Sequence, residues 1–344
     1  MDKRRNAAAC TIKEVAACAG VTPAIVSRVF NGDKTLTIKE ETRQAVLEAI
    51  RKLNYQPNSI ARSLRTKRNR TFGVIITDIM NPFFTEVIKG IQIAANEAGY
   101  RIILCDTEEN PEKEKQYIED LSAQQVDGII LGSSYLENEV VEVLDACGTK
   151  YVLLNRATSH SSAPYVGTDD TTGMMRAVEH LVSLGHSRVA HIAGPLYTDT
   201  ALRRLEGYRK GLREAHLGYN PQYVMEARYD EQSGYEVCRR LLEACSPRPT
   251  AICCCNDLVA IGALRALKEL GLTVPGDISV VGYNDIWVSS LLSPPLTTIR
   301  TPLLEMGRTA FELLLALVQG EPHQKRVRLE THLVVRQSTA PLRR

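Results

Sequence analysis

Short apolar runs that alternate with helical patterns constrain the fold of this chain more than any other feature. Runs of four or five mainly apolar residues are typical of strands buried on both faces of a parallel sheet, because βαβ crossovers cover both faces with helices. The pattern repeats too often for one such domain, so it predicts more than one α/β unit. The runs are residues 72–76, 101–105, 128–131, 151–154, 189–193, 251–254 and 278–281.

Residues 11 to 31 follow a different pattern, that of two short helices joined by a turn. Thr11 and Thr22 each stand where a helix N-cap is expected, and Pro23 occupies a first helical position, where its missing N–H costs nothing. Apolar residues share one face of each helix, and Gly20 lies in the turn between them. The spacing predicts a helix-turn-helix unit.

The outer face of the second helix is a candidate DNA-reading surface. Recognition helices present the side chains near their start to the major groove, and Pro23, Ala24, Ser27 and Arg28 lie there. Arg28 is suited to donate two hydrogen bonds to a guanine edge. An ordinary helical hairpin with a solvated Arg28 fits the motif alone equally well.

Residues 38–53 form a third amphipathic segment, which we expect to close a small helical core with Thr37 as its cap. A short helix capped by Asn58 is then expected before a basic run. A helix of about eight residues is marginal alone in water, so it is a candidate hinge that folds on binding. Leu64, next to Arg65, is suited to wedge into a minor groove, and a solvated linker is the alternative.

Charge is divided unevenly along the chain. Residues 1–70 hold 15 Lys and Arg against 6 Asp and Glu, whereas residues 71–344 hold 27 against 34. The overall net charge of +2 therefore conceals a basic head and an acidic body. This asymmetry indicates a polyanionic partner at one end only, whose binding weakens as salt rises.

Composition and motifs argue against several other classes. No apolar run approaches the roughly 18 residues of a membrane span. The basic start MDKRRNAAAC has too short an apolar stretch for a signal peptide, so a cytoplasmic location is expected. Nine cysteines without C-x-x-C spacing predict neither a disulfide framework nor a metal site. Phosphate-loop, dinucleotide, nucleophile-elbow and zinc-protease motifs are all missing, so we expect neither a cofactor nor catalysis.

The order of motifs resembles the LacI/GalR family of bacterial transcriptional regulators, over Thr11 to Ala340. The helix-turn-helix is followed by Y-x-P-N-x-x-A-R-x-L and by the strand region FGVIITDIMNPFF. Later segments keep the family's order: VDGIILGS, HLVSLGHSRVAHIAGP, RRLEGYRKGL, CNDLVAIGALRALKELGLTVPGDISVVGYND and PPLTTIRTP. The resemblance implies a homodimeric repressor of a pseudo-palindromic operator in double-stranded DNA. It also implies a small effector, a sugar, phosphosugar or nucleoside, in the cleft of the core.

The same resemblance implies the domain organisation. An all-α helix-turn-helix headpiece is expected over residues 1–57 and a hinge helix with its linker over 58–70. The rest, 71–344, is expected to be a periplasmic-binding-protein-like core of parallel sheets flanked by helices, which binds effector and dimerises. Its N-lobe would span about 71–167 and 301–326, and its C-lobe about 168–300 and 327–344.

For DNA, the resemblance assigns base reading to Pro23, Ala24 and Arg28, a phosphate contact to Ser27 and the minor-groove wedge to Leu64. Pro23 and Ala24 lack hydrogen-bonding side chains, so direct readout would depend on Arg28 and on apolar contact with thymine methyl groups. The remaining candidate DNA contacts are Thr22, Asn58, Ala61 and Arg65.

Candidate effector-binding residues follow the strands, where open α/β sheets bind ligands. Asp257 is suited either to bind ligand hydroxyls or, like Asn256, to cap a helix. Arg204 on spacing alone is more typical of a solvated or ion-paired group, and Phe83 with Phe84 is as typical of core as of a pocket wall. The resemblance assigns ligand contacts to Arg204, Asp257 and the two phenylalanines. Further candidates are Asp78, Asn155, Arg156, Asp169, Tyr229 and Asp285.

Two other classes share parts of this pattern. A solute-binding protein of a sugar or nucleoside import system would share the two-lobed body, but it would carry a signal peptide and lack the basic helical head. An enzyme acting on a sugar in the cleft would need a nucleophile and a base at recognisable spacing.

Thr198 stands where a purine-responsive member of the family has an arginine, which argues against a purine-like ligand.

Overall fold

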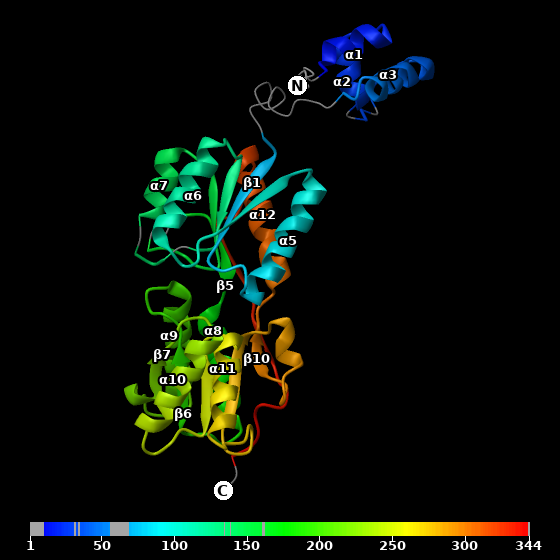
Figure 1. Cartoon of the computed structure of the whole chain (residues 1–344). Helices are drawn as coiled ribbons and strands as arrows, with labels where there is room; N and C mark the ends of the chain where they lie inside the picture. The colour runs from blue at the N-terminus through cyan, green and yellow to red at the C-terminus, as the bar shows by residue number, and fades with distance from the viewer. Residues whose placement is uncertain are drawn as a thin grey trace, which may run out of the picture. The chain divides into compact units, whose positions relative to one another are not determined.

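The computed structural model describes residues 10–30, 32–33, 35–55, 69–133, 135–137, 139–159 and 162–342. Its contacts divide the chain into two compact units, Met1–Asn69 and Arg70–Arg344, here called the head and the core (Figure 1). The expected hinge helix lies outside the described residues, and so do its candidate DNA contacts Asn58, Ala61, Leu64 and Arg65.

The head contains the three helices that the apolar spacing predicts. They are α1 (Ile12–Ala19), α2 (Pro23–Phe30) and α3 (Glu40–Lys52), packed around a small apolar cluster. Thr11 begins α1 with a capping box, because its hydroxyl accepts from the N–H of Glu14 while the Glu14 carboxylate accepts from the N–H of Thr11. Gly20 ends α1 at a φ of 66°, the left-handed conformation that glycine adopts without strain.

The expected cap of the third helix is wrong. The helix begins at Glu40, and Lys39 rather than Thr37 occupies its N-cap position, without a side-chain cap bond. Glu40 and Glu41 in the first turn complement the positive end of the helix dipole instead.

The first lobe of the core is built on a six-stranded parallel sheet of order β11-β5-β4-β3-β1-β2. Helices α5 (Pro82–Ala98) and α12 (Leu303–Gln319) share one apolar cluster with the sheet. Helices α6 (Pro111–Ala123) and α7 (Val140–Cys147) share another, on the opposite face. The strands are β1 (Thr71–Ile76), β2 (Arg101–Asp106), β3 (Gly128–Leu131), β4 (Tyr151–Leu154), β5 (Tyr165–Thr168) and β11 (Arg326–Leu329).

The second lobe repeats this layering with the order β12-β10-β9-β8-β6-β7, in which only the β12 pairing is antiparallel. One face packs on α8 (Asp170–Ser183) and α9 (Asp199–Glu214), the other on α10 (Glu231–Ala244) and α11 (Asp257–Glu269). The strands are β6 (Val189–Ala193), β7 (Val224–Glu226), β8 (Ala251–Cys254), β9 (Ser279–Asn284), β10 (Thr297–Arg300) and β12 (His332–Val334), and short 3-10 turns occupy Pro221–Tyr223 and Trp287–Ser290.

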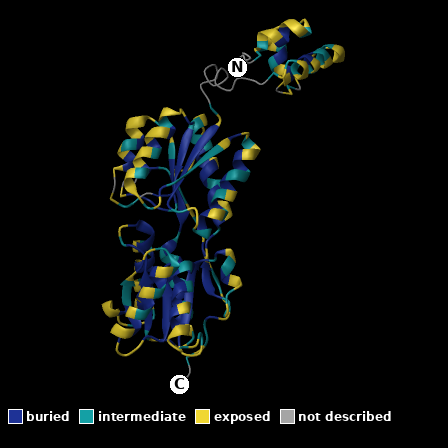
Figure 2. Ribbon diagram, in the orientation of Figure 1, coloured by how far each residue is buried: buried dark blue, intermediate teal, exposed yellow. Residues whose placement is uncertain are grey.

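This architecture confirms the predicted fold class, and every strand-like run forms a strand. Figure 2 shows the buried residues along both sheets and the exposed ones on the outer faces of the helices. The lobes are joined by three crossings, of which the last is displaced from its expected place. Val327 pairs with Val166 in the first sheet, so the chain returns to the second lobe after Leu329 rather than near residue 327. No helix of the described residues is long and apolar enough to cross a membrane.

Helices α5 and α12 meet through two glycines. A Cβ atom added to Gly307 would lie 2.0 Å from the carbonyl oxygen of Val87, and one added to Gly90 would lie 2.1 Å from that of Leu304. Real Cβ atoms do not approach backbone so closely, so the two helices touch main chain to main chain.

We therefore expect Gly307→Ala to destabilise the core by about 1–3 kcal/mol, the usual cost of overpacking, measured by urea unfolding. Gly218→Ala is the matched control, because no atom lies within 4 Å of the added Cβ. Equal stability of the two variants would contradict the close contact.

Candidate functional site

A cavity of about 470 Å³ lies between the two lobes, bordered by residues that follow strands of both sheets. This volume falls within the range of small-molecule sites, and ligands of open α/β sheets bind at such strand ends. Seven of the ten candidate effector-binding residues line it: Asp78, Phe83, Phe84, Asn155, Arg156, Arg204 and Tyr229.

Phe83 and Phe84 have both of the roles that the sequence left open. They stand in the first turn of α5, where the Asn81 side chain accepts from the N–H of Phe83. Both rings are buried in the apolar cluster under the sheet and pack edge to face, with centroids 5.0 Å apart. They also border the cavity, so a ligand would meet a rigid apolar wall.

The hypothesis that Asp257 faces the ligand requires correction. Its side chain is fully buried, and the carboxylate accepts from the N–H of Ile286 at 2.8 Å and from the hydroxyls of Ser289 at 2.8 Å and Thr298 at 2.6 Å. Burial raises the pKa of Asp257 to about 6. The preceding residue, Asn256, caps α11 by accepting from the N–H of Val259 and lines the cavity.

Asp285 and Asp169 are likewise placed outside the lining. Asp285 forms ion pairs with Arg300 at 2.7 Å and Arg336 at 2.6 Å. Asp169 caps α8 by accepting from the N–H of Thr172. Beside Asp285, as beside Asp257, the preceding asparagine lines the cavity, and this residue is Asn284. Looking for amides beside the acids at strand ends would have found both asparagines.

Arg204 is the least exposed of the three arginines that line the cavity. It forms an ion pair with Asp170 at 2.9 Å, donates to the carbonyl of Cys255 at 2.6 Å and lies 3.9 Å from the centroid of the Tyr283 ring. Only 3% of the residue is exposed. Arg204 is therefore ion-paired and also lines the cavity, and its contact with a ligand stays a prediction.

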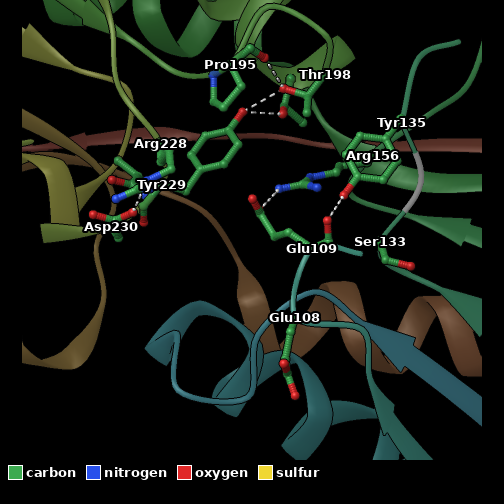
Figure 3. A network of polar contacts seen from close by, with 12 residues as sticks. Glu108, Glu109, Ser133, Tyr135, Arg156, Pro195, Thr198, Arg228, Tyr229 and Asp230 are labelled. Carbon is green, nitrogen blue, oxygen red and sulfur yellow. Dashed lines mark hydrogen bonds and ion pairs between the residues drawn. The ribbon is translucent and has the colours of Figure 1, made fainter. Parts of the chain in front are cut away.

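A polar network links the side chains at one side of the cavity (Figure 3). Arg156 pairs with Glu109 at 3.1 Å, and its guanidinium lies 5.2 Å from the centroid of the Tyr229 ring. The Tyr229 hydroxyl is within hydrogen-bond distance of Thr198 at 2.8 Å and Thr200 at 3.1 Å. Thr198 therefore holds the aromatic ring of Tyr229 rather than lining the cavity itself.

Several cavity residues were missed because their signals are local to loops. The loop after β2 supplies Glu108 and Glu109, both at positive φ, 51° and 55°. Positive φ values redirect side chains in a way that periodicity does not predict. The other lining residues outside the hypothesis are Thr77, Asn81, Thr200, Arg228 and Asp230.

In the head, the candidate base-reading residues lie on or beside α2. Thr22, Pro23, Ala24 and Arg28 are exposed, and Ser27 is half-buried. The Arg28 guanidinium is not free in solvent, because it is hydrogen-bonded to side chains of the segment that follows α2.

Comparisons with known proteins agree with the two units. Residues 11–58 match the family described as bacterial regulatory proteins of the lacI family, and residues 178–339 match the periplasmic binding protein-like domain. The HTH-type transcriptional repressor PurR of Haemophilus influenzae (strain PittEE) is 36% identical over 332 residues, 95% of this chain and 98% of that protein. PurR of Vibrio campbellii is also 36% identical, over 96% of this chain and 99% of that protein.

Solved structures give the same result. The lac repressor dimer bound to operator and the anti-inducer ONPF matches with a TM-score of 0.86 at 32% identity, over 97% of this chain and 100% of that chain. The complex of the regulator CelR with cellobiose matches with a TM-score of 0.74 at 33% identity, over 96% and 99%.

A helix-turn-helix head on a two-lobed core with a cavity defines a transcriptional regulator. The relatives and structures named above, which match over nearly the full length, are regulators of this kind. This chain belongs to the lacI family of bacterial regulatory proteins.

We expect Asp257 to make the stability of the core depend on pH. Because its pKa in the folded chain, about 6, lies above the ordinary value of 3.8, folding favours the protonated form, and stability is lost as pH rises through about 6. Asp257→Asn should lose this dependence, about 2–3 kcal/mol between roughly pH 4 and pH 7. Thr298 can then accept from the new amide by rotating its hydroxyl.

The measurement is urea unfolding across that pH range, with the exposed Glu119→Gln as control. An Asp257→Asn variant that keeps the pH dependence of the unchanged protein would show that the burial of Asp257 does not determine it.

Proposed function

We propose that this protein is a cytoplasmic repressor that binds a pseudo-palindromic operator as a homodimer and responds to a small polar effector in its cavity. The observation that carries the proposal is the combination, in one chain, of an exposed Arg28 on the second helix of a basic head and a lined cavity in the core. PurR relatives named as repressors support it, and so do the operator-bound lac repressor dimer and the cellobiose-bound CelR.

The chemistry of the head supports reading of a duplex. Pro23 and Ala24 offer only apolar contact, which suits thymine methyl groups, whereas Arg28 offers paired donors to guanine. Ser27 is assigned to phosphate and Thr22 to the start of the recognition helix. In the proposed dimer, the two-fold axis of the protein coincides with that of the operator. The hinge contacts Asn58, Ala61, Leu64 and Arg65 complete the proposed interface.

The lobes are tied together beside the cavity, which supports a role in signalling. Asp199 of α9 accepts from the N–H of Ala157 in the first lobe at 2.9 Å. Arg203, one turn further on, pairs with Asp170 at 3.1 Å and donates to the Tyr165 hydroxyl of the first lobe at 2.8 Å. A ligand that prefers one degree of lobe closure would shift the population of states through these contacts.

The lining supports binding rather than transformation of the effector. Among the cavity residues that the structure describes there is no serine, cysteine, histidine or lysine. Serine, cysteine or lysine nucleophiles and a histidine base therefore have no candidate among these residues, whereas amides, aromatic rings and ion pairs are typical of recognition.

Selection of genomic DNA fragments by the purified full chain at moderate salt tests the proposal. We expect enrichment of one palindromic sequence, and we expect Arg28→Ala to lose it, because a bidentate guanine contact is worth about 1–3 kcal/mol of discrimination. Arg51→Ala is the control, since it removes the same charge from an exposed position in the last turn of α3.

The selection is repeated with sugars and nucleosides present, so that an effector-dependent interaction is detected. If the unchanged protein enriches no sequence under any of these conditions, the proposed regulator is overturned.

A further inference from the structure

Every guanidinium that lines the cavity is already paired with a carboxylate of the core. Ion pairs of this kind compete directly with an anionic ligand, because a phosphate would have to replace the internal partner. The pairs are Arg156–Glu109 at 3.1 Å, Arg204–Asp170 at 2.9 Å and Arg228–Asp230 at 2.9 Å.

The inner pair is held from several sides. Arg204 is bonded to the Cys255 carbonyl and lies against Tyr283, so its guanidinium has no room to turn. Asp170 is fully buried and also pairs with Arg203. Withdrawing Arg204 from Asp170 would leave buried charge poorly compensated, which proteins avoid.

The two outer pairs are also anchored. The Arg156 side chain is only 5% exposed and packs against Tyr229, so it cannot swing away from Glu109. Arg228 is exposed, but its partner Asp230 is the N-cap of α10, accepting from the N–H of Ser233 at 2.7 Å. That carboxylate therefore stays beside Arg228.

Carboxylates outnumber guanidiniums in the lining, four to three. Asp78 accepts from the N–H of Met80, and among the described residues it forms no ion pair. Glu108 is neutralised by Lys113 at 3.0 Å, which is outside the lining. Each guanidinium of the lining thus has a carboxylate partner, and Asp78 adds a further negative charge, which disfavours phosphate groups.

Neutral groups of the lining complement a hydroxylated ligand. Oδ1 of Asn155 is buried and accepts no hydrogen bond from the described residues, so it requires a donor. A hydroxyl group can donate to it, whereas an ionised phosphate only accepts. Phe83 and Phe84 supply an apolar wall for a ring.

We propose that the effector is an uncharged polyhydroxylated molecule and that the cavity rejects phosphorylated compounds. This inference rests on the proposed effector site and removes phosphosugars from its ligands. A failed DNA selection would overturn the proposed regulator. It would not affect the proposed preference for uncharged ligands, because that preference is measured by ligand binding to the cavity of the core and not by DNA binding.

Thermal unfolding with matched pairs of compounds tests the proposal. The probes are ribose and ribose 5-phosphate, glucose and glucose 6-phosphate, and adenosine and its 5′-monophosphate, at constant ionic strength. We expect any stabilisation to come from the neutral member of a pair. A phosphorylated compound that raises Tm more than its neutral partner overturns the proposal.

Glu109→Gln provides a decisive variant because it releases Arg156 while keeping the side-chain shape. We expect inorganic phosphate to stabilise this variant at a concentration about tenfold lower than the unchanged protein. Glu112→Gln, exposed in the first turn of α6, is the control. Equal phosphate responses of Glu109→Gln and the unchanged protein overturn the proposal, even if none of the neutral probes binds.

An independent observation concerns Arg28 in the head. Its Nε donates to Oδ2 of Asp33 at 2.7 Å, and its Nη2 donates to the hydroxyl of Thr35 at 3.0 Å. The carboxylate is fixed in turn, because Asp33 accepts from both the N–H and the hydroxyl of Thr35 at 2.8 and 2.7 Å. These bonds hold the pKa of Asp33 down to about 2, so it is charged at neutral pH.

These contacts occupy one edge of the guanidinium, and within the part of the head that the structure describes no partner occupies the other edge. Nη1 and the second hydrogen of Nη2 remain as two parallel donors, the arrangement that matches O6 and N7 of guanine. We infer that Asp33 is a positioning residue, which aims Arg28 at a base and keeps it from turning to the nearest phosphate. This inference rests on the proposed DNA reading by Arg28.

The test compares binding to the selected sequence with binding to a copy carrying one guanine replaced. We expect Asp33→Ala to lower this ratio about 5- to 100-fold and to leave binding to random DNA unchanged or stronger. Glu48→Ala, which removes the same charge from an exposed position on α3, should leave the ratio unchanged. Thr35→Val, which keeps the carboxylate, should give a smaller loss.

The double variant Arg28→Ala with Asp33→Ala separates positioning from a structural role. If Asp33 acts through Arg28, its removal has no further effect on the ratio once Arg28 is gone. An unchanged ratio in Asp33→Ala, or an equal loss in the Arg28→Ala background, overturns the inference. If the unchanged protein shows no sequence preference, the proposed function itself fails.

Discussion

The buried ion pair between Arg204 and Asp170 is the interaction on which the cavity depends. It joins α9 to α8, and through the Cys255 carbonyl and the Tyr283 ring it also fixes the ends of β8 and β9. Arg203 extends the same cluster to Tyr165 in the first lobe. The same group of charges therefore holds the cavity lining around Arg204 and the contact between the lobes. Removing one member of such a buried pair is strongly destabilising.

Much of the fold could be predicted because its signals are local. Helix caps, apolar spacing and short hydrophobic runs determine α1, α2 and the seven predicted strands within a few residues. The strand β11, with the sequence RVRL, contains no continuous apolar run, so these signals do not predict it. Its arginines alternate with apolar residues at the edge of a sheet, and it is a strand because β5 offers it a parallel partner more than 150 residues away in the sequence.

The candidate site was less predictable, for a physical reason. Strand ends indicated the correct region, but acids were preferred there over amides. Buried acids such as Asp257 need several internal donors, which turn them away from a ligand, whereas the neighbouring amides border the cavity. Asn284 and Asp285 also have positive φ values, 106° and 58°, so the simple alternation of strand side chains ends before them. Only coordinates show which neighbour faces inward.

The order of the elements along the chain also affects how the protein is made. The first sheet receives α12 and β11 only after the whole of β6 to β10 has been synthesised. Until then, the face of β1 and β4 that will pack on Phe311 and Leu314 has no cover from α12. A growing chain therefore carries an incomplete first lobe through more than a hundred residues of translation, a period in which chaperones would have an apolar surface to bind.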